Sequence, residues 1–116
     1  MRKRIIYLAG PMKGMPEKNH PLFIEVTRQL REAGHRVYSP QEYPSNGQNG
    51  FDIRRAFASY ATFICLEADT LVLLPGWENS LGATCERALA ENCRDIEILE
   101  WKTSWDILGC GEELTA

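Results

Sequence analysis

The 116-residue sequence contains no long apolar run, and this absence excludes several classes of protein. No segment approaches the roughly 18 consecutive apolar residues of a membrane-spanning helix. The first apolar run is also too short for the core of a secretory signal peptide. No internal repeat or low-complexity segment is present either. We therefore expect a cytoplasmic protein that does not associate with a membrane.

Positive charge is not in excess. The chain has 13 Lys and Arg against 16 Asp and Glu, a net charge of −3 and a pI near 5.4. Binding to a phosphate backbone requires clustered Lys and Arg. The basic residues at positions 2–4 run directly into an apolar segment, so they flank a strand and do not form a basic arm. We expect no nucleic acid polymer as a partner.

The cysteines lack the CxxC spacing of zinc sites and redox motifs. They are Cys65, Cys85, Cys93 and Cys110, and the first three fall on predicted helices. Neither a zinc site nor a disulfide framework is expected from this distribution. Reduced cysteines that mostly pack as small apolar side chains are the simpler interpretation. We expect no metal and no cofactor.

Hydrophobic spacing alternates along the chain between strand-like and helix-like segments. Strands are expected at residues 4–9, 36–39, 70–74 and 96–99, and helices at about 20–34, 52–66 and 81–93. Sequential βα units predict an α/β fold, a single doubly wound domain of the flavodoxin or Rossmann type, with a mostly parallel sheet and helices on both faces. Residues 1–100 form this domain. The 101–116 tail has no readable pattern and is expected to pack on the domain or on a neighbouring subunit.

The predicted helices differ in amphipathicity. The first has one apolar stripe, formed by Phe23, Val26, Leu30 and Ala33. The second has an apolar face of Ile53, Phe57, Ala61 and Ile64 with Tyr60 and Phe63 beside it, so both of its flanks are expected to be buried. Between the second strand and this helix, residues 41–50 form a polar loop rich in Gly, Asn and Pro that we expect to be mobile.

Two apolar strands run into glycine-containing turns. The first turn reads Gly10-Pro11-Met12-Lys13-Gly14. In an open α/β sheet, ligands bind outside the carboxyl ends of the strands at a topological switch point. Glycines let the backbone approach a ligand and point amides at it, and Lys13 adds a positive charge. This turn is therefore either an anion-binding turn or an ordinary one.

The second turn leads into the third helix and contains Trp77, Ser80 and Gly82. The free N–H groups at that helix start form a second candidate anion site. Two such turns together favour a phosphate-bearing ligand. Trp77 either stacks on a nucleobase or covers the end of the sheet, and both interpretations remain open.

Glu86 lies one turn into the third helix, on a strip with Gly82 and Leu89 at the edge of the predicted core. Such a carboxylate is either a satisfied edge glutamate or a reactive one. Desolvation at that place raises the pKa of a carboxyl group and suits it to nucleophilic or acid-base work. Tyr7, at the carboxyl end of the first strand, is placed for its hydroxyl to reach Glu86.

The segment from Tyr7 to Pro11, followed by the segment from Ser80 to Glu86, resembles the nucleoside 2-deoxyribosyltransferase superfamily. The resemblance runs from about Arg4 to Glu100 and is closest to small bacterial and phage domains of unknown function that carry an LPGWENS-type segment. It implies that Glu86 attacks the anomeric carbon of an N-glycoside, releases the base and forms a glycosyl-enzyme, with Tyr7 orienting the carboxylate. The logic of a carboxylate stabilising an oxocarbenium-like transition state then applies. A homodimer or larger homo-oligomer is implied, because neighbouring subunits often complete these sites.

The resemblance also separates branches of the superfamily. Transferases commonly have an aspartate where this chain has Ser80, whereas the branch that hydrolyses deoxynucleoside 5′-monophosphates has a serine. Ser80 with Lys13 therefore favours a nucleotide. The usual base-protonating aspartate is missing, because the corresponding stretch begins at Tyr60. Asp69 does not replace it, since it starts the central strand at the opposite end of the sheet. Whether leaving-group activation survives is open.

We therefore expect N-glycosidic bond cleavage or base exchange on a nucleoside 5′-monophosphate, with a small-molecule nucleotide or nucleoside as partner. One alternative is a nucleotide-binding protein that has lost catalysis and sequesters a nucleotide or a nucleotide-derived signal. Another is a structural domain whose Trp101 and Trp105 form an interface with a partner.

Overall fold

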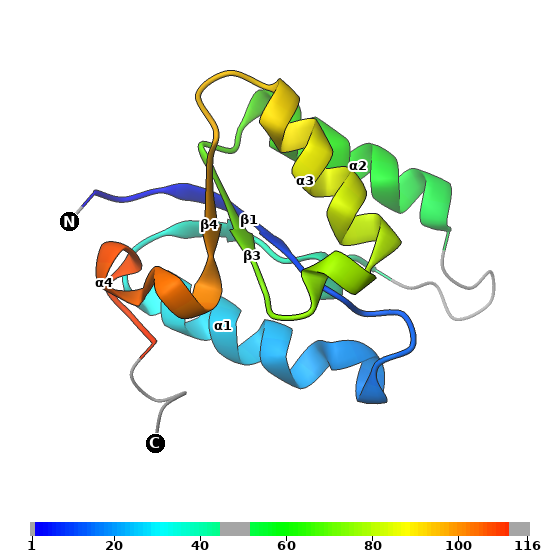
Figure 1. The fold of residues 1–116 in the computed structure, drawn as a ribbon, viewed down its shortest axis with the longest axis horizontal. Helices are drawn as coiled ribbons and strands as arrows, with labels where there is room; N and C mark the ends of the chain where they lie inside the picture. The colour runs from blue at the N-terminus through cyan, green and yellow to red at the C-terminus, as the bar shows by residue number, and fades with distance from the viewer. Residues whose placement is uncertain (1, 45–51, 112–116) are drawn as a thin grey trace.

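The computed structural model describes residues 2–44 and 52–111. The predicted helices and strands are present with bounds within two residues of those expected, and a short helix at Trp105–Leu108 follows that was not predicted (Figure 1). They are β1 Ile5–Ala9, α1 His20–Glu32, β2 Arg36–Tyr38, α2 Ile53–Leu66, β3 Thr70–Leu73, α3 Leu81–Asn92, β4 Glu97–Glu100 and α4 Trp105–Leu108. Short 3-10 turns lie at Pro16–Asn19, Pro40–Glu42, Trp77–Asn79 and Trp101–Thr103. Most of the predicted polar loop lies outside the described residues.

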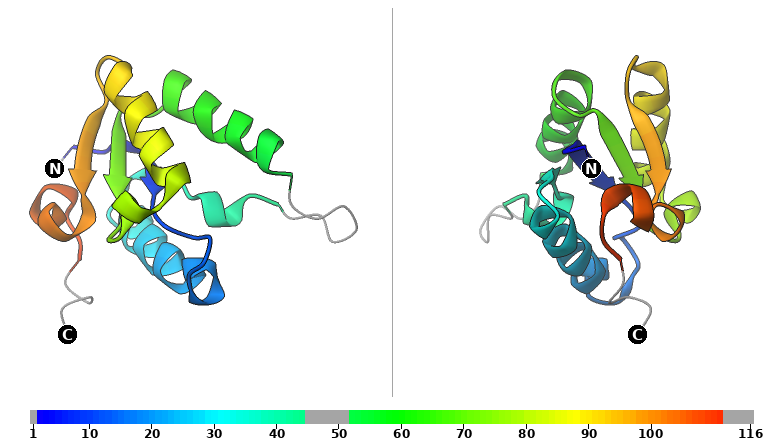
Figure 2. Two further views of the ribbon diagram at one scale, coloured as in Figure 1. Left: turned by 45° about the vertical axis from the view of Figure 1, so that its right-hand side comes forward. Right: turned by 90° about the vertical axis from the view of Figure 1, so that its left-hand side faces the viewer.

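The four strands form one parallel sheet in the order β2-β1-β3-β4. The chain moves from β1 outward to β2 and then crosses back to β3 on the other side of β1. The topological switch point therefore lies between β1 and β3. Helix α1 covers one face of the sheet, and α2 with α3 covers the other (Figure 2). The predicted doubly wound α/β fold is confirmed.

The core on the α1 face explains why residues beyond 100 belong to the fold. Alternate β1 side chains, Ile6 and Leu8, pack there with Phe23 of α1. Trp101 and Leu108 are buried in the same core. The interpretation of Trp101 as part of an intermolecular surface is therefore wrong, because its side chain is used inside the chain.

A buried histidine fastens this C-terminal segment to the domain. The backbone N–H of Arg4 donates to Nδ1 of His35 at 3.0 Å. Nε2 therefore carries the ring proton and donates to the carbonyl of Leu108 at 2.9 Å. A further bond runs from the N–H of Gly111 to the side-chain oxygen of Gln29 at 2.7 Å. These bonds satisfy polar groups that burial would otherwise penalise.

The core on the α2 and α3 face corrects the expected orientation of α2. The residues that α2 buries are Ala56, Tyr60, Phe63 and Ile64. Ile53 is 49% exposed and Phe57 is 38% exposed, so the prediction that both flanks of the helix are buried is wrong for these two residues. The strip with Tyr60 and Phe63 is buried, whereas the neighbouring strip is exposed at Ile53 and Phe57 and buried at Ile64.

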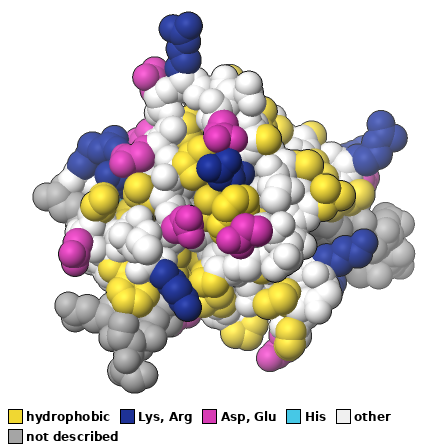
Figure 3. All heavy atoms as spheres, viewed as in Figure 1, with side chains coloured by type: hydrophobic (Ala, Val, Ile, Leu, Met, Phe, Trp, Pro, Cys, Tyr) yellow, Lys and Arg dark blue, Asp and Glu magenta, His cyan; other side chains and the backbone are white. Residues whose placement is uncertain are grey.

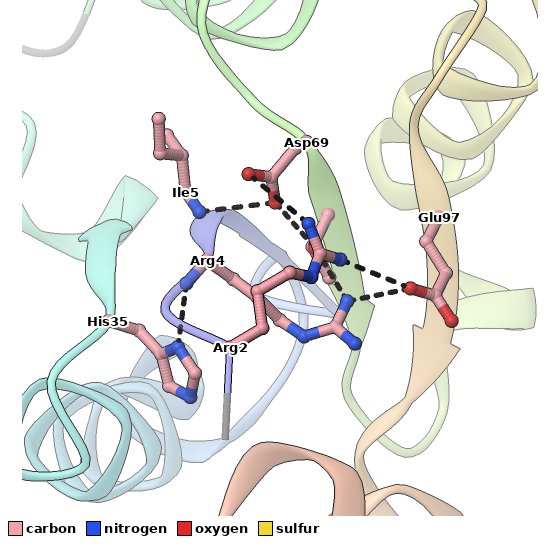
Figure 4. Close-up of polar contacts among 7 residues, drawn as sticks. Arg2, Arg4, Ile5, His35, Asp69 and Glu97 are labelled. Atoms are coloured by element: carbon pink, nitrogen blue, oxygen red, sulfur yellow. Dashed lines mark hydrogen bonds and ion pairs between the residues drawn. The ribbon is translucent and has the colours of Figure 1, made fainter.

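The two ends of the sheet carry different chemistry. At the amino ends of the strands, the guanidinium of Arg4 contacts Glu97 Oε1 at 2.7 Å and Thr70 Oγ1 at 3.0 Å (Figure 4). Asp69 accepts from the N–H of Ile5 at 3.2 Å at this same end. Asp69 is thus at the opposite end of the sheet from the two turns, as predicted. These charges serve the fold.

The surface bears on three expectations from the sequence: charge distribution, membrane spans and the cysteines. On the face drawn in Figure 3, basic and acidic side chains are interspersed and no single sign dominates. Within residues 2–44 and 52–111, no helix is both long and apolar enough to cross a membrane. Cys65 and Cys85 are exposed, so the expectation that the cysteines mostly serve packing is wrong for these two.

Candidate functional site

The two predicted turns lie side by side at the switch point. β1 and β3 are neighbours in the sheet, and the N–H of Leu74 donates to the carbonyl of Ala9 at 2.8 Å just where both strands end. A Cβ added at Gly10 would lie only 2.7 Å from Leu74 Cβ, and one added at Gly76 would lie 3.3 Å from Pro11 Cγ. Gly10 is therefore required for close contact between the turns, a role in packing that needs no ligand.

The first turn presents its residues in different ways. Pro11 is buried, and its carbonyl accepts from the side-chain amide of Asn19 at 2.9 Å. Met12 is partly buried against the α1 core. Lys13 is exposed, and Gly14 adopts a left-handed conformation with φ of 84° and open space around it. The turn can thus offer Lys13 and backbone amides to a ligand, whereas the Met12 side chain points into the fold.

The chain continues into an unusual segment before α1. Glu17, Lys18 and Asn19 have φ values of 50°, 53° and 61°, three consecutive residues in the left-handed region. Each such residue costs roughly 1–2 kcal/mol relative to ordinary backbone geometry. Asn19 offsets part of this cost through its bond to Pro11, which ties the segment to the first turn.

Glu86 is the central group of the candidate site. Its side chain comes from the inner face of α3 and is 8% exposed. The hydroxyl of Tyr7, at 0% exposure in the middle of β1, donates to Glu86 Oε2 at 2.7 Å. The contact expected from the sequence is present. A short bond between a phenol and a carboxylate fixes the orientation of the carboxyl group.

Burial controls the protonation of this pair. Desolvation raises the pKa of Glu86 to about 7, and the hydrogen bond from Tyr7 opposes the rise. The pKa of Tyr7 is raised well above its ordinary value, first by desolvation and then by the nearby Glu86 charge. Tyr7 therefore remains a neutral donor, while Glu86 exchanges its proton near neutral pH. Among the described residues, no cation or second carboxylate contributes to the shift at Glu86.

An aromatic cluster surrounds the Tyr7 ring on its α2 side. Tyr60 lies 5.9 Å from Tyr7 between ring centroids, and Tyr38 lies 5.5 Å from it in a stacked arrangement. Tyr43 and Phe57 contact Tyr60 edge to face. Burial raises the pKa of Tyr60 to about 12, so its hydroxyl is an even poorer acid than an ordinary phenol. Tyr60 faces the candidate site but cannot replace a carboxylic acid.

Sequence reasoning missed Tyr38 and Tyr43. Both line a surface hollow of about 350 Å³, together with Val37, Ser39, Glu42, Pro44 and Ser59. Tyr38 also exchanges a hydrogen bond with the hydroxyl of Ser59 at 2.5 Å. Tyr38 ends β2 at the same edge of the sheet as the two turns, and that position is the signal that would have identified it.

Ser80 and Gly82 have different roles at the start of α3. Ser80 caps the helix, because its Oγ accepts from the N–H of Ala83 at 3.1 Å. Such a cap stabilises a helix by about 1 kcal/mol. Its hydroxyl proton is not needed for capping and can be donated to an anion. A Cβ added at Gly82 would meet Phe57 at an ordinary 3.5 Å, so packing alone does not demand glycine there.

Trp77 sits in the second turn with one face already in contact. The guanidinium of Arg87 lies 5.2 Å from the centre of its ring, and Arg87 also pairs with Glu91 at 2.8 Å. Stacking on a nucleobase would have to use the other face of the indole. The buried Nε1–H of Trp77 has no hydrogen-bond partner within the described part of the chain. The sequence analysis did not identify this contact between Arg87 and Trp77.

Comparison with protein families identifies the chain. The profile of a family described as a domain of unknown function, DUF4406, matches residues 4–99. This chain belongs to the DUF4406 family. No curated protein matches it.

The DUF4406 match covers both turns, Tyr7, Tyr60 and Glu86, and it stops before the buried Trp101. Membership in DUF4406 assigns no activity. Among the residues that the structure describes, no group of three or more His, Cys, Asp or Glu side chains is placed to hold a metal ion. Glu86 and its neighbours are the groups that the two turns bring together.

Proposed function

We propose that this DUF4406 protein cleaves the N-glycosidic bond of a nucleoside 5′-monophosphate, or exchanges its base, with Glu86 as the nucleophile. The observation that carries the proposal is the buried Glu86 carboxyl group held by Tyr7 at 2.7 Å beside the switch point. A poorly solvated carboxylate that is half ionised near neutral pH is suited to attack a carbon that develops positive charge. The likeness to nucleoside 2-deoxyribosyltransferases suggests the same chemistry.

Each residue has a defined part in the proposed reaction. Glu86 attacks the anomeric carbon while the base departs. Water or a second base then attacks the same carbon and releases the Glu86 carboxylate. Tyr7 holds Oε2 and leaves Oε1 for the attack. The 5′-phosphate is bound between the adjoining turns, because they bring a positive charge and hydrogen-bond donors together. These groups are Lys13, the Ser80 hydroxyl and the amides near Gly14 and Gly82.

The weak point of this chemistry is the leaving group. A base leaves poorly as an anion, and a positioned general acid typically contributes roughly 10²–10⁴-fold. Tyr60, with its pKa raised to about 12, supplies no such acid. This observation favours a second candidate function, in which the same site binds and sequesters a nucleotide and turns it over slowly or not at all.

One experiment separates the two functions. The full chain is incubated with a panel of ribonucleoside and deoxyribonucleoside monophosphates. Free base is measured by chromatography, and binding is measured by calorimetry on the same samples. Release of base supports the enzyme, whereas binding without release supports the sequestering protein. If the chain neither binds nor cleaves any member of the panel, both functions are wrong.

A further inference from the structure

Two cysteines from different helices meet at the end of the α2–α3 pair. Cys65 lies in the last turn of α2, and Cys93 directly follows the last residue of α3. The Sγ atoms are 4.0 Å apart, with the thiol of Cys93 donating to Cys65. Figure 1 shows α2 and α3 running side by side and ending at the same end of the molecule. The two residues are 28 positions apart in the sequence, so only the fold brings them together.

The geometry leaves a short path to a bond. A disulfide has an S–S distance of about 2.05 Å, so the sulfurs must approach by about 2 Å. Both residues lie at helix ends and outside the core, so neighbouring side chains do not hold the two thiols in place. Cys65 is exposed and Cys93 is partly exposed, so a small oxidant can reach the pair.

We propose that Cys65 and Cys93 are an oxidation site that closes into an intramolecular disulfide when a hydroperoxide reacts with the protein. One thiolate attacks the peroxide, becomes a sulfenic acid and releases an alcohol, or water in the case of hydrogen peroxide. The second thiolate then attacks that sulfur and expels hydroxide, which leaves as water after taking a proton. Two thiols are oxidised to one disulfide, and the peroxide is reduced.

The bond would join the helices that carry Tyr60 and Glu86. It closes a long loop of chain, which restricts the unfolded state and raises the melting temperature by roughly 5–15 °C. The site does not depend on the proposed N-glycosidic activity. Both sulfurs lie at the carboxyl-terminal ends of α2 and α3, whereas the capping residues Asp52 and Ser80 lie at the amino-terminal ends. Its test therefore stands whether or not the chain cleaves nucleotides.

The test uses the Cys85→Ser variant of the full chain, because Cys85 shares a tryptic peptide with Cys65. In this variant, residues 56–87 contain Cys65 alone and residues 88–94 contain Cys93 alone. The protein is treated with a modest excess of hydrogen peroxide, digested without reduction and analysed by mass spectrometry. The matched control carries Cys65→Ser in addition. Melting is followed by circular dichroism before and after treatment, with and without dithiothreitol.

We expect a cross-linked pair of these two peptides, two hydrogen atoms lighter than their sum, that dithiothreitol separates. The cross-link should be absent from the control, and the melting temperature should rise only in the protein that can form it. Sulfenic or sulfinic acid on both cysteines without a cross-link would overturn the proposal. Bonds from either cysteine to Cys110, or to another chain, would overturn it equally.

Discussion

At the scale of single residues, Glu86 is the feature that departs most from an ordinary surface glutamate. Its ordinary pKa is 4.5, and burial raises the pKa to about 7. Between these values the folded protein holds a proton that the unfolded chain has released. The free energy of unfolding must therefore fall as the pH rises through this interval.

The expected size of this effect is about 3 kcal/mol between about pH 4 and about pH 8, because each tenfold difference in proton affinity corresponds to about 1.4 kcal/mol. Glu86→Gln keeps the shape and the acceptor for Tyr7 but cannot ionise. Relative to wild type, the variant should gain stability as the pH rises. Urea denaturation of both proteins at the two pH values measures the difference. A difference that stays constant with pH would show that Glu86 is not buried as described.

Lys13 makes a separate prediction. Hydrogen bonds to charged groups contribute roughly 1.5–3 kcal/mol each, so Lys13→Ala should weaken binding of a nucleoside monophosphate by about tenfold or more. Binding of the corresponding nucleoside should hardly change. Calorimetry with both ligands measures the effect, and Lys102→Ala, another exposed lysine outside the two turns, is the control. Equal losses for nucleotide and nucleoside would count against a phosphate contact.

Tyr60 tests the leaving-group argument. Tyr60→Asp places a carboxylic acid next to Tyr7, and a working general acid contributes roughly 10²–10⁴-fold, so base release should increase. Tyr60→Phe removes only the hydroxyl and should not increase it. Chromatography of released base compares the three proteins, after circular dichroism has shown that each is folded. Tight nucleotide binding with no release by wild type or Tyr60→Asp would favour the sequestering function.

At the scale of secondary-structure elements, the site results from where strands end. Tyr7 and the first turn come from β1, and Glu86 follows the turn after β3. Since neighbouring parallel strands end at the same edge, the strand-turn-helix pattern was enough to predict that these residues meet. The Tyr7–Glu86 contact follows from that topology, and the helical spacing from Ser80 to Glu86 sets its geometry.

Other elements were not predictable in the same way. Helix α2 has two apolar strips, and spacing alone does not say which strip faces the sheet, so the exposure of Ile53 and Phe57 was missed. The strand that carries Tyr38 was predicted, but the contacts of Tyr38 with Tyr60 depend on how α2 packs, which spacing did not fix. Trp101 lies in a segment without periodicity. Its burial depends on tertiary packing in the α1-face core, where the bond from His35 to the carbonyl of Leu108 also holds the C-terminal segment.

The close contact between the ends of β1 and β3 leads us to expect different effects on stability from alanine at Gly10 and at Gly82. A methyl group at Gly10 would overlap Leu74, and overpacking of this kind costs roughly 1–3 kcal/mol, so Gly10→Ala should lower the free energy of unfolding by that amount. Gly82→Ala meets only ordinary contacts and lies in a helix, where alanine is favoured. It should be neutral or stabilising. Urea denaturation compares them, and equal destabilisation would contradict the packing described.

At the scale of the whole molecule, the DUF4406 chain is built around one parallel sheet whose two ends carry different polar groups. A polar network joins the strands at their amino ends and consists of Arg4, Asp69, Thr70 and Glu97. The carboxyl ends carry the buried carboxyl group and the two turns. We propose that Glu86 is the nucleophile of an N-glycosidic reaction at this second end.

The most direct measurement follows free base and protein mass together when wild type and Glu86→Gln are incubated with nucleoside monophosphates. Wild type should release base and gain the mass of a sugar phosphate on the peptide that contains Glu86. Glu86→Gln should remain folded, release no base and gain no mass. Base release by Glu86→Gln at a rate similar to that of wild type would show that Glu86 is not the nucleophile.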